Sequence, residues 1–393
     1  WAVTEGGEIA VSYTKNTLEE TGRLLTQGGP RDILATEDGL FIHASQNFDV
    51  YRVDANGKIG ETWTVGEDPR SEQAKAGQRH FIRPGTGYGA NFSCNSCHLE
   101  GVGDTRIWQA GPLQTWETSR PMMWLEGTAP LGWGAYVADV RTFGYTGFTS
   151  IINKWPDAED AEDLATYLAS FAPPPKANTW TQRDGTHSEA GLRGKTLFEG
   201  KAQCASCHAL PLTTSNITFD NGVSEHRTST PVLVGAYRHN VWLKEAQARS
   251  LKDAIRQVLD WTQVSDITDA ELDDLTRYVQ ELTDRDFFVL NYDPSFNRTL
   301  IGADNPIKIT FNQPVWTDED NLSRITLRKK GGGVVKATME WRWRCSEVVM
   351  GWGGRRGGQE KQPGPGVFFA VLSPGLDPPA RLVHRRWWTG GPA

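Results

Sequence analysis

Two copies of one five-residue pattern carry the chemistry that this sequence offers. The first copy is Cys94-Asn95-Ser96-Cys97-His98 and the second is Cys204-Ala205-Ser206-Cys207-His208. In a C-x-x-C-H pattern the two thiols add to the vinyl groups of a porphyrin, and the histidine becomes the proximal ligand of the iron. Four of the five cysteines are used in this way. The sequence therefore predicts two covalently attached c-type haems, with His98 and His208 as iron ligands.

Other uses of paired cysteines account for less of the pattern. A structural zinc site built from two C-x-x-C pairs needs no histidine directly after each pair. A thioredoxin-like redox pair follows a strand and opens a helix within a βαβ unit, and neither motif has that setting. Disulfides within each pair would leave the two matched histidines as a coincidence.

Length and composition place limits on the class of protein. The chain has 393 residues, enough for about two to four domains. The sequence has no apolar run of about 18 residues or more, so we expect no transmembrane span. The net charge of -7 argues against a nucleic-acid partner. The 16 tryptophans suit the aromatic lining of haem pockets.

The chain begins at Trp1, without an initiator methionine. Covalent haem attachment in bacteria takes place on the outer side of the cytoplasmic membrane. We therefore expect an exported protein, periplasmic or at the cell surface, with a secretion signal upstream of Trp1.

Two mainly α-helical cytochrome c domains are predicted at the centre of the chain, over residues 67–175 and 185–290. Each contains one C-x-x-C-H motif, and a proline-rich linker separates them. Leu164, Tyr167, Leu168 and Phe171 follow helical spacing, and Thr268 opens a capping box before a second apolar helix. Cytochrome c domains end in such a helix, so whole domains are repeated as well as motifs.

Segments rich in β-strand patterns are expected on both sides of this pair, which makes the fold class multidomain. Residues 31–66 alternate polar and apolar residues between Asp-Gly and Asn-Gly turns. Residues 1–66 therefore resemble part of a β-propeller whose other blades would lie upstream, and a small β cap is the alternative. Residues 291–345 resemble part of an Ig-like β-sandwich. Residues 346–393 are rich in glycine, proline and arginine, which predicts an irregular tail, disordered or translated from a shifted reading frame.

The second half resembles a known family in more than its haem motif. The matching segments are Gly194-Lys195-Thr196-Leu197-Phe198 before Cys204 and Thr230-Pro231-Val232-Leu233-Val234-Gly235 after His208. This order is similar to the di-haem cytochrome c peroxidase superfamily, which includes the MauG-type enzymes. The segment from Cys94 to Asp104 resembles propeller-linked members of that group. The resemblance covers residues 65–290 and implies two c-type cytochrome domains.

This sequence departs from the family at the residues that face the haems. The family's H-D-G segment falls on Lys244-Glu245-Ala246, with Leu243 at the position that often supplies a distal ligand. The family's H-W-x-G segment aligns with Gly132-Trp133-Gly134-Ala135, so this histidine is also absent. The peroxidatic residues of the family are therefore not carried over, and no catalytic residue is assigned.

The sixth iron ligand decides what each haem does, because a closed iron transfers electrons and an open iron binds small molecules. For the first haem, Met122 or Met123 is a candidate distal ligand, although both are also suited to the protein core. For the second haem, His239 is the favoured candidate, and the alternative is an iron without a distal ligand. His226 and Lys244 are further candidates there.

Three functions remain open from the sequence. The first is electron transfer by a di-haem c-type cytochrome that meets redox partner proteins outside the cytoplasm. The second is a di-haem peroxidase-like oxidoreductase with one open haem. The third is a scaffold or binding protein whose β modules dock partners while the haems supply redox activity. The missing family histidines favour the first over the second.

Overall fold

We describe the fold from a computed structural model of the chain. It describes residues 2–283 apart from 5, 7, 8, 55, 56, 69, 85–91, 111–114, 152–154, 172–177 and 221–226. Beyond them it describes 289–293, 307–311, 325–329, 334–335, 338–342, 347–351 and 368–372. Contacts divide the chain into two compact units, Trp1–Thr283 and Asp284–Ala393. His226, Cys345 and the proline-rich linker lie outside the described residues.

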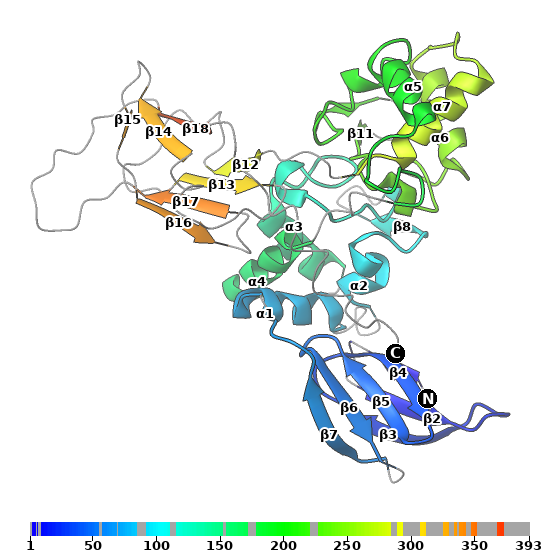
Figure 1. The fold of residues 1–393 in the computed structure, drawn as a ribbon, viewed down its shortest axis with the longest axis vertical. Helices are drawn as coiled ribbons and strands as arrows, with labels where there is room; N and C mark the ends of the chain where they lie inside the picture. Colours follow the sequence, from blue (N-terminus) through cyan, green and yellow to red (C-terminus); the bar gives the residue numbers. More distant parts are fainter. Residues whose placement is uncertain are drawn as a thin grey trace, which may run out of the picture. The chain divides into compact units, whose positions relative to one another are not determined.

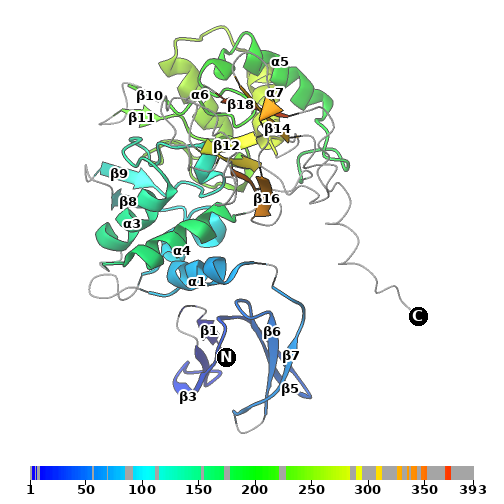
Figure 2. The same cartoon turned by 90° about the vertical axis from the view of Figure 1, so that its left-hand side faces the viewer.

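The N-terminal part consists of two antiparallel sheets that share a small apolar core. The three-stranded sheet contains β1 (Ala2–Thr4), β2 (Ile9–Tyr13) and β3 (Glu20–Leu25), and the four-stranded sheet contains β4 (Pro30–Thr36), β5 (Gly39–Ala44), β6 (Asp49–Val53) and β7 (Ile59–Thr64). Figure 2 shows the second sheet as a ribbon of neighbouring strands. Alternate residues of β5 and β6, such as Ile42 and Tyr51, are buried, as the sequence pattern predicts. No sheet among the described residues closes into a ring, so a propeller is not confirmed.

The first helical module follows these sheets and contains the motif at Cys94. Its elements are α1 (Glu72–Ile82), α2 (Cys94–Cys97), η2 (Leu99–Gly101), β8 (Ile107–Ala110), β9 (Thr115–Thr118), η3 (Leu125–Gly127), α3 (Val140–Ser150) and α4 (Ala158–Ala169). The longer helices begin where Ser71, Asp139 and Asp157 accept hydrogen bonds from the first-turn amides. Buried Phe81, Phe148 and Leu164 join α1, α3 and α4 in one core.

The second helical module contains the motif at Cys204 and has a similar order of elements, with one short 3-10 helix in place of α2 and η2. Its elements are α5 (Glu189–Glu199), η4 (Cys204–Ser206), β10 (Thr218–Phe219), β11 (Thr228–Ser229), η5 (Ala236–Arg238), α6 (Leu251–Trp261) and α7 (Asp269–Gln280). The capping box that the sequence predicts at Thr268 is present, with Glu271 as its reciprocal partner. Figure 1 shows α5, α6 and α7 together and α1 lying across α4.

The two modules repeat each other residue by residue over their second halves. Helices α3 and α6 begin at Val140 and Leu251, and α4 and α7 begin at Ala158 and Asp269, a constant offset of 111 residues. The same offset relates the isolated bridges Leu131–Val137 and Trp242–Ala248. It also relates the left-handed residues Trp124 and Gly235, each of which precedes a short 3-10 helix. The likeness extends to the connecting loops, where Ala135 and Ala246 both have a positive φ angle.

A glycine allows the first and last long helices of each module to cross closely. A Cβ at Gly77 of α1 would overlap the Asp163 carbonyl oxygen of α4, and a Cβ at Gly194 of α5 would overlap that of Asp274 in α7. Asp163 and Asp274 are themselves related by the offset of 111. An aromatic pair packs beside each crossing, with ring centroids 5.4 Å apart for Phe81 and Tyr167 in the first module. The matching centroids of Phe198 and Tyr278 are 5.2 Å apart.

The unit from Asp284 to Ala393 contains two further antiparallel sheets. One has the order β12 (Val289–Asp293), β13 (Ile307–Phe311), β17 (Glu347–Gly351) and β16 (Thr338–Arg342), and the other has β15 (Val334–Val335), β14 (Ile325–Lys329) and β18 (Phe368–Leu372). Ile309, Phe311 and Ile325 are buried. Antiparallel pairing agrees with the predicted β segment, but the Ig-like assignment is not confirmed.

The prediction of an irregular tail over residues 346–393 is wrong for two stretches. β17 pairs with β13 along four residues, and β18 pairs with β14 along five. β17 contains two valines, and β18 contains two phenylalanines and a valine, residues that favour extended pairing. The composition of the whole segment is dominated by glycine and proline, so composition alone does not predict these two strands. The remaining residues of the tail, including His384, lie outside the described residues.

No helix in the part of the chain that the structure describes is both long enough and apolar enough to cross a membrane.

The capping box of α7 stabilises the second module at neutral pH, and this contribution is lost in acid. Hydrogen bonds from the Thr268 backbone, from Lys201 and from the Thr268 hydroxyl lower the pKa of Glu271 from 4.5 to about 2. A carboxyl whose pKa is depressed in the folded state stabilises the fold above its unfolded value of 4.5 and loses that contribution as the pH falls toward 2. We therefore expect Glu271→Gln to be less stable than the wild type near neutral pH and equal to it near pH 2. Urea midpoints measured across this range check the prediction, and a pH-independent difference would contradict it.

Candidate haem sites

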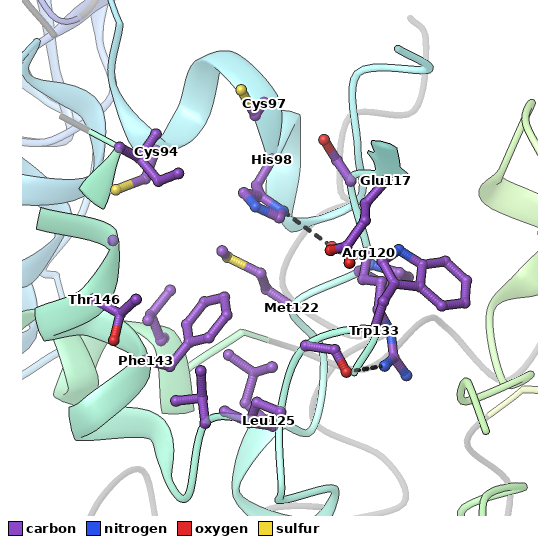
Figure 3. Close-up of a pocket in the computed structure, with 18 of the residues that line it drawn as sticks. Cys94, Cys97, His98, Glu117, Arg120, Met122, Leu125, Trp133, Phe143 and Thr146 are labelled. Carbon is purple, nitrogen blue, oxygen red and sulfur yellow. Dashed lines mark hydrogen bonds between the residues drawn. The ribbon is translucent and has the colours of Figure 1, made fainter. Parts of the chain in front are cut away.

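The first candidate site is a cavity of about 510 Å³ in the first helical module. Cys94, Cys97 and His98 line it together, so the structure brings the three residues of the motif to one space. Figure 3 shows these side chains around the cavity, with Phe143 and Thr146 of α3 on one side and Arg120 and Trp133 on the other. The volume is within the range of about 300–1,000 Å³ that cofactor pockets occupy.

The geometry of His98 suits an axial iron ligand. Its Nδ1 atom lies 2.9 Å from the carbonyl oxygen of Arg120, which accepts a hydrogen bond from the ring and leaves Nε2 for a metal. Burial lowers the pKa of His98 to about 4, against the opposing effect of this carbonyl. The ring is therefore neutral near pH 7, which is the form that ligates iron.

The four cysteines are available for attachment. Cys94, Cys97, Cys204 and Cys207 are free thiols, so neither motif is closed as a disulfide. Burial raises the pKa of Cys94 to about 12 and that of Cys97 to about 11. These are protonated thiols in a mostly apolar cavity, the form that adds across a porphyrin vinyl group. The donor set and the largely apolar lining of the first cavity both fit a c-type haem.

The second site repeats this arrangement at His208. Its Nδ1 atom lies 2.9 Å from the carbonyl oxygen of Thr213. Burial lowers the pKa of His208, and the backbone carbonyls of Thr213 and Pro231 partly offset that shift. Pro231, which follows Arg120 by the offset of 111 residues, also has a carbonyl that acts on His208, but the carbonyl 2.9 Å from Nδ1 belongs to Thr213, a different position of the repeat.

The structure separates the two methionines that the sequence leaves equivalent. Both are buried and both line the first cavity. Met123 receives a contact of 3.5 Å on its sulfur from the Arg238 guanidinium of the second module. In Figure 3 the Met122 side chain lies beside the His98 ring. Met122 therefore stays a predicted distal ligand of the first haem, whereas the sulfur of Met123 already has a partner.

The role of His239 as a ligand of the second haem stays a prediction. His239 follows Thr128, which lines the first cavity, by 111 residues. Its ring packs edge to face on Trp242, with centroids 5.9 Å apart. Burial and the positive charges of Arg238 and Arg120 lower its pKa to about 4, so the ring is neutral near pH 7.

Lys244, another candidate ligand for the second haem, forms an ion pair with Glu117 instead. Its ammonium is buried and lies 3.7 Å from Glu117 Oε1, a carboxylate that lines the first cavity. The Glu117 carboxylate also accepts hydrogen bonds from Thr115 at 2.7 Å and from the Tyr136 hydroxyl at 3.4 Å. A buried ion pair thus joins the two modules, and no feature of the sequence pointed to it.

Arg120 is the second residue that sequence reasoning missed. Its guanidinium donates hydrogen bonds to the Gly132 carbonyl at 2.9 Å and to the Ser229 hydroxyl of the second module at 2.6 Å. It also lies over the Trp133 ring, 4.9 Å from the centroid. A single arginine before a proline carries no signal of such a position, because the contact joins residues 109 apart.

Comparison with known proteins assigns one module to a family. Residues 192–283 match the family model described as Cytochrome c. This stretch includes Cys204, Cys207 and His208, so the second module is a cytochrome c domain, a domain that carries covalently bound c-type haem. No curated protein matches the chain.

Several solved structures are distantly similar. Hydrazine synthase from Kuenenia stuttgartiensis is 18% identical, with a TM-score of 0.49 over 59% of this chain and 99% of that chain. A MauG-like protein associated with microbial copper homeostasis is 15% identical, with a TM-score of 0.43 over 56% and 91%. The di-haem peroxidase BthA from Burkholderia thailandensis is 14% identical, with a TM-score of 0.40 over 65% and 96%. At this distance the activities of these proteins do not transfer to the chain.

Proposed function

We propose that the chain is a di-haem c-type cytochrome that transfers electrons, with one haem in each helical module. The observation that carries this proposal is the repeated setting of the two motif histidines. In both modules the Nδ1 atom lies 2.9 Å from a backbone carbonyl, and the histidine is half-buried with its Nε2 atom left for iron. The cytochrome c match of residues 192–283 supports the second haem, and the internal repeat extends the argument to the first.

Each residue of the motif has a separate task in this proposal. Cys94 and Cys97 hold the first haem, and Cys204 and Cys207 hold the second. The carbonyls of Arg120 and Thr213 fix which ring nitrogen of each histidine faces the iron. Buried Phe81, Leu125 and Leu131 keep water from the first cavity, which influences the reduction potential there. When bound, the haems supply one-electron redox couples.

The electrons come from and pass to redox partner proteins outside the cytoplasm. Covalent attachment through two thioethers supports this location, because bacteria carry it out on the outer side of the cytoplasmic membrane. The acidic net charge of -7 supports protein partners over nucleic acid. A role as a scaffold, with the β sheets docking partners, is an extension of the same proposal.

A second candidate function is a peroxidase-like oxidoreductase. The residues of α3 that line the first cavity favour it. Gly144, Thr146, Gly147 and Ser150 line this cavity, and a Cβ at Gly147 would meet no atom within 4 Å. None of these can ligate iron. Met122 follows Arg120 by two residues, and the Arg120 carbonyl lies behind the proximal ring. Met122 would then pack beside His98 without ligating iron, and the first haem, when bound, would offer a site for a small molecule.

Carbon monoxide distinguishes the two functions. If the first haem is open, we expect the reduced protein to bind about one equivalent, and Met122→Leu to behave like the wild type. If Met122 is the ligand, the wild type stays unreactive and Met122→Leu binds carbon monoxide. Met123→Leu is the matched control. A purified protein without covalent haem absorbance would overturn both functions.

A further inference from the structure

We propose that Arg120 is a positioning residue that couples the two haem sites, orienting His98 through its backbone and the support of His208 through its side chain. This inference rests on the proposed di-haem function and adds a link between the sites. The first half of the link is the hydrogen bond that the Arg120 carbonyl accepts from His98 Nδ1 at 2.9 Å.

The second half runs from the Arg120 guanidinium into the second module. Nη1 donates to the Ser229 hydroxyl at 2.6 Å and to the Gly132 carbonyl at 2.9 Å, and the Ser229 hydroxyl donates to the same carbonyl at 2.9 Å. The Ser229 amide donates to the Trp133 carbonyl at 2.6 Å. Three polar groups therefore hold the end of β11 against the first module.

The chain after Ser229 leads directly to the support of His208. Pro231, two residues on, has the backbone carbonyl that acts on the His208 ring, and Pro231 also lines the first cavity. The Leu233 and Val234 amides donate to the buried Thr213 hydroxyl at 2.8 Å and 3.2 Å. The Thr213 carbonyl accepts the hydrogen bond from His208. A displacement of Ser229 is thus passed to the group that orients the second histidine.

The guanidinium is suited to this task because its planar donors are fixed relative to one another. It also lies 4.9 Å from the centroid of the Trp133 ring, which holds its plane by a cation–π contact. The groups that accept its hydrogen bonds are a carbonyl and a hydroxyl, so the directions of these hydrogen bonds matter as well as the positive charge. Lysine would keep the charge and lose the fork of donors.

The test uses the haem-loaded full chain with Arg120→Met, which keeps the backbone carbonyl and removes the guanidinium. Ser229→Ala is the second variant, because it removes one hydroxyl and leaves the core intact. Arg141→Met makes the same change of charge on the exposed surface of α3, where the arginine side chain is 59% exposed, and serves as the control. The readouts are the electron paramagnetic resonance signal of each haem and the rate at which one electron redistributes between the haems after partial reduction.

We expect Arg120→Met, which keeps the carbonyl behind His98, to shift the signal of the second haem more than that of the first. We expect it to slow the redistribution by about tenfold, the lower end of what lost outer partners of a metal ligand cost in activity. We expect Ser229→Ala to shift the signal of the second haem and Arg141→Met to change neither. If both site variants carry two haems with signals and a rate equal to those of the wild type, the coupling role is overturned. If the wild type itself lacks two haems, the proposed function fails instead, and haem content reports this separately. If Arg120→Met does not fold, Ser229→Ala decides the result alone.

Discussion

Gly194→Ala is expected to destabilise the second module by about 3 kcal/mol or more, the upper range for overpacking. The added Cβ would overlap the Asp274 carbonyl oxygen, a backbone atom within α7 that has no freedom to move aside. It would also press on the Tyr278 side chain at 2.8 Å. In a domain of this size the loss corresponds to a fall in Tm of more than about 10 °C. Thermal unfolding followed by circular dichroism checks the value.

The matched control for this substitution is Gly66→Ala, where an added Cβ meets nothing within 4 Å. We expect that variant to unfold within about 2 °C of the wild type, since exposed substitutions change stability by about 0.5 kcal/mol or less. Gly77→Ala should behave like Gly194→Ala, because a Cβ there would overlap the Asp163 carbonyl oxygen. An unchanged Tm for both crossing glycines would show that the helices do not approach as closely as described.

Replacing both cysteines of one motif with alanine is expected to remove one haem and leave the other. The Cys94→Ala, Cys97→Ala pair should halve the covalent haem absorbance, and the Cys204→Ala, Cys207→Ala pair should do the same. The reason is that each pair lies in its own module, with its own histidine and carbonyl support. Denaturing extraction followed by pyridine haemochrome absorbance measures the remaining haem.

Two outcomes of the cysteine experiment would contradict independent sites. If either double variant loses both haems, haem attachment in one module depends on attachment in the other. No loss from the first pair would mean that Cys94 and Cys97 carry no haem, although they line one cavity with His98. The substitutions for alanine keep small side chains in the cavity, so loss of the fold is not the expected cause of either result.

Local patterns made much of the fold predictable. The strands from residue 30 to 64 follow alternation and turn residues, and the strands β4 to β7 confirm them. The capping box at Thr268 is visible as a threonine with glutamate three residues later, and it is present. β17 and β18 were missed because each is a short apolar run within a segment dominated by glycine and proline.

The core of each candidate site was also predictable, because adjacent residues carry it. The motif residues Cys94, Cys97 and His98 are close in sequence and line one cavity. The groups that support them are distant in sequence, as Arg120 with Ser229 and Glu117 with Lys244 show. Single polar residues at such positions have no periodicity, so their pairing requires the three-dimensional structure.

The intact mass of the purified, denatured protein tests the central claim most directly. The account predicts the mass of the polypeptide plus two haems, because both modules offer two free thiols and a histidine oriented by a backbone carbonyl. A mass with one haem would contradict a haem in each module, and a mass without haem would contradict the proposed function altogether.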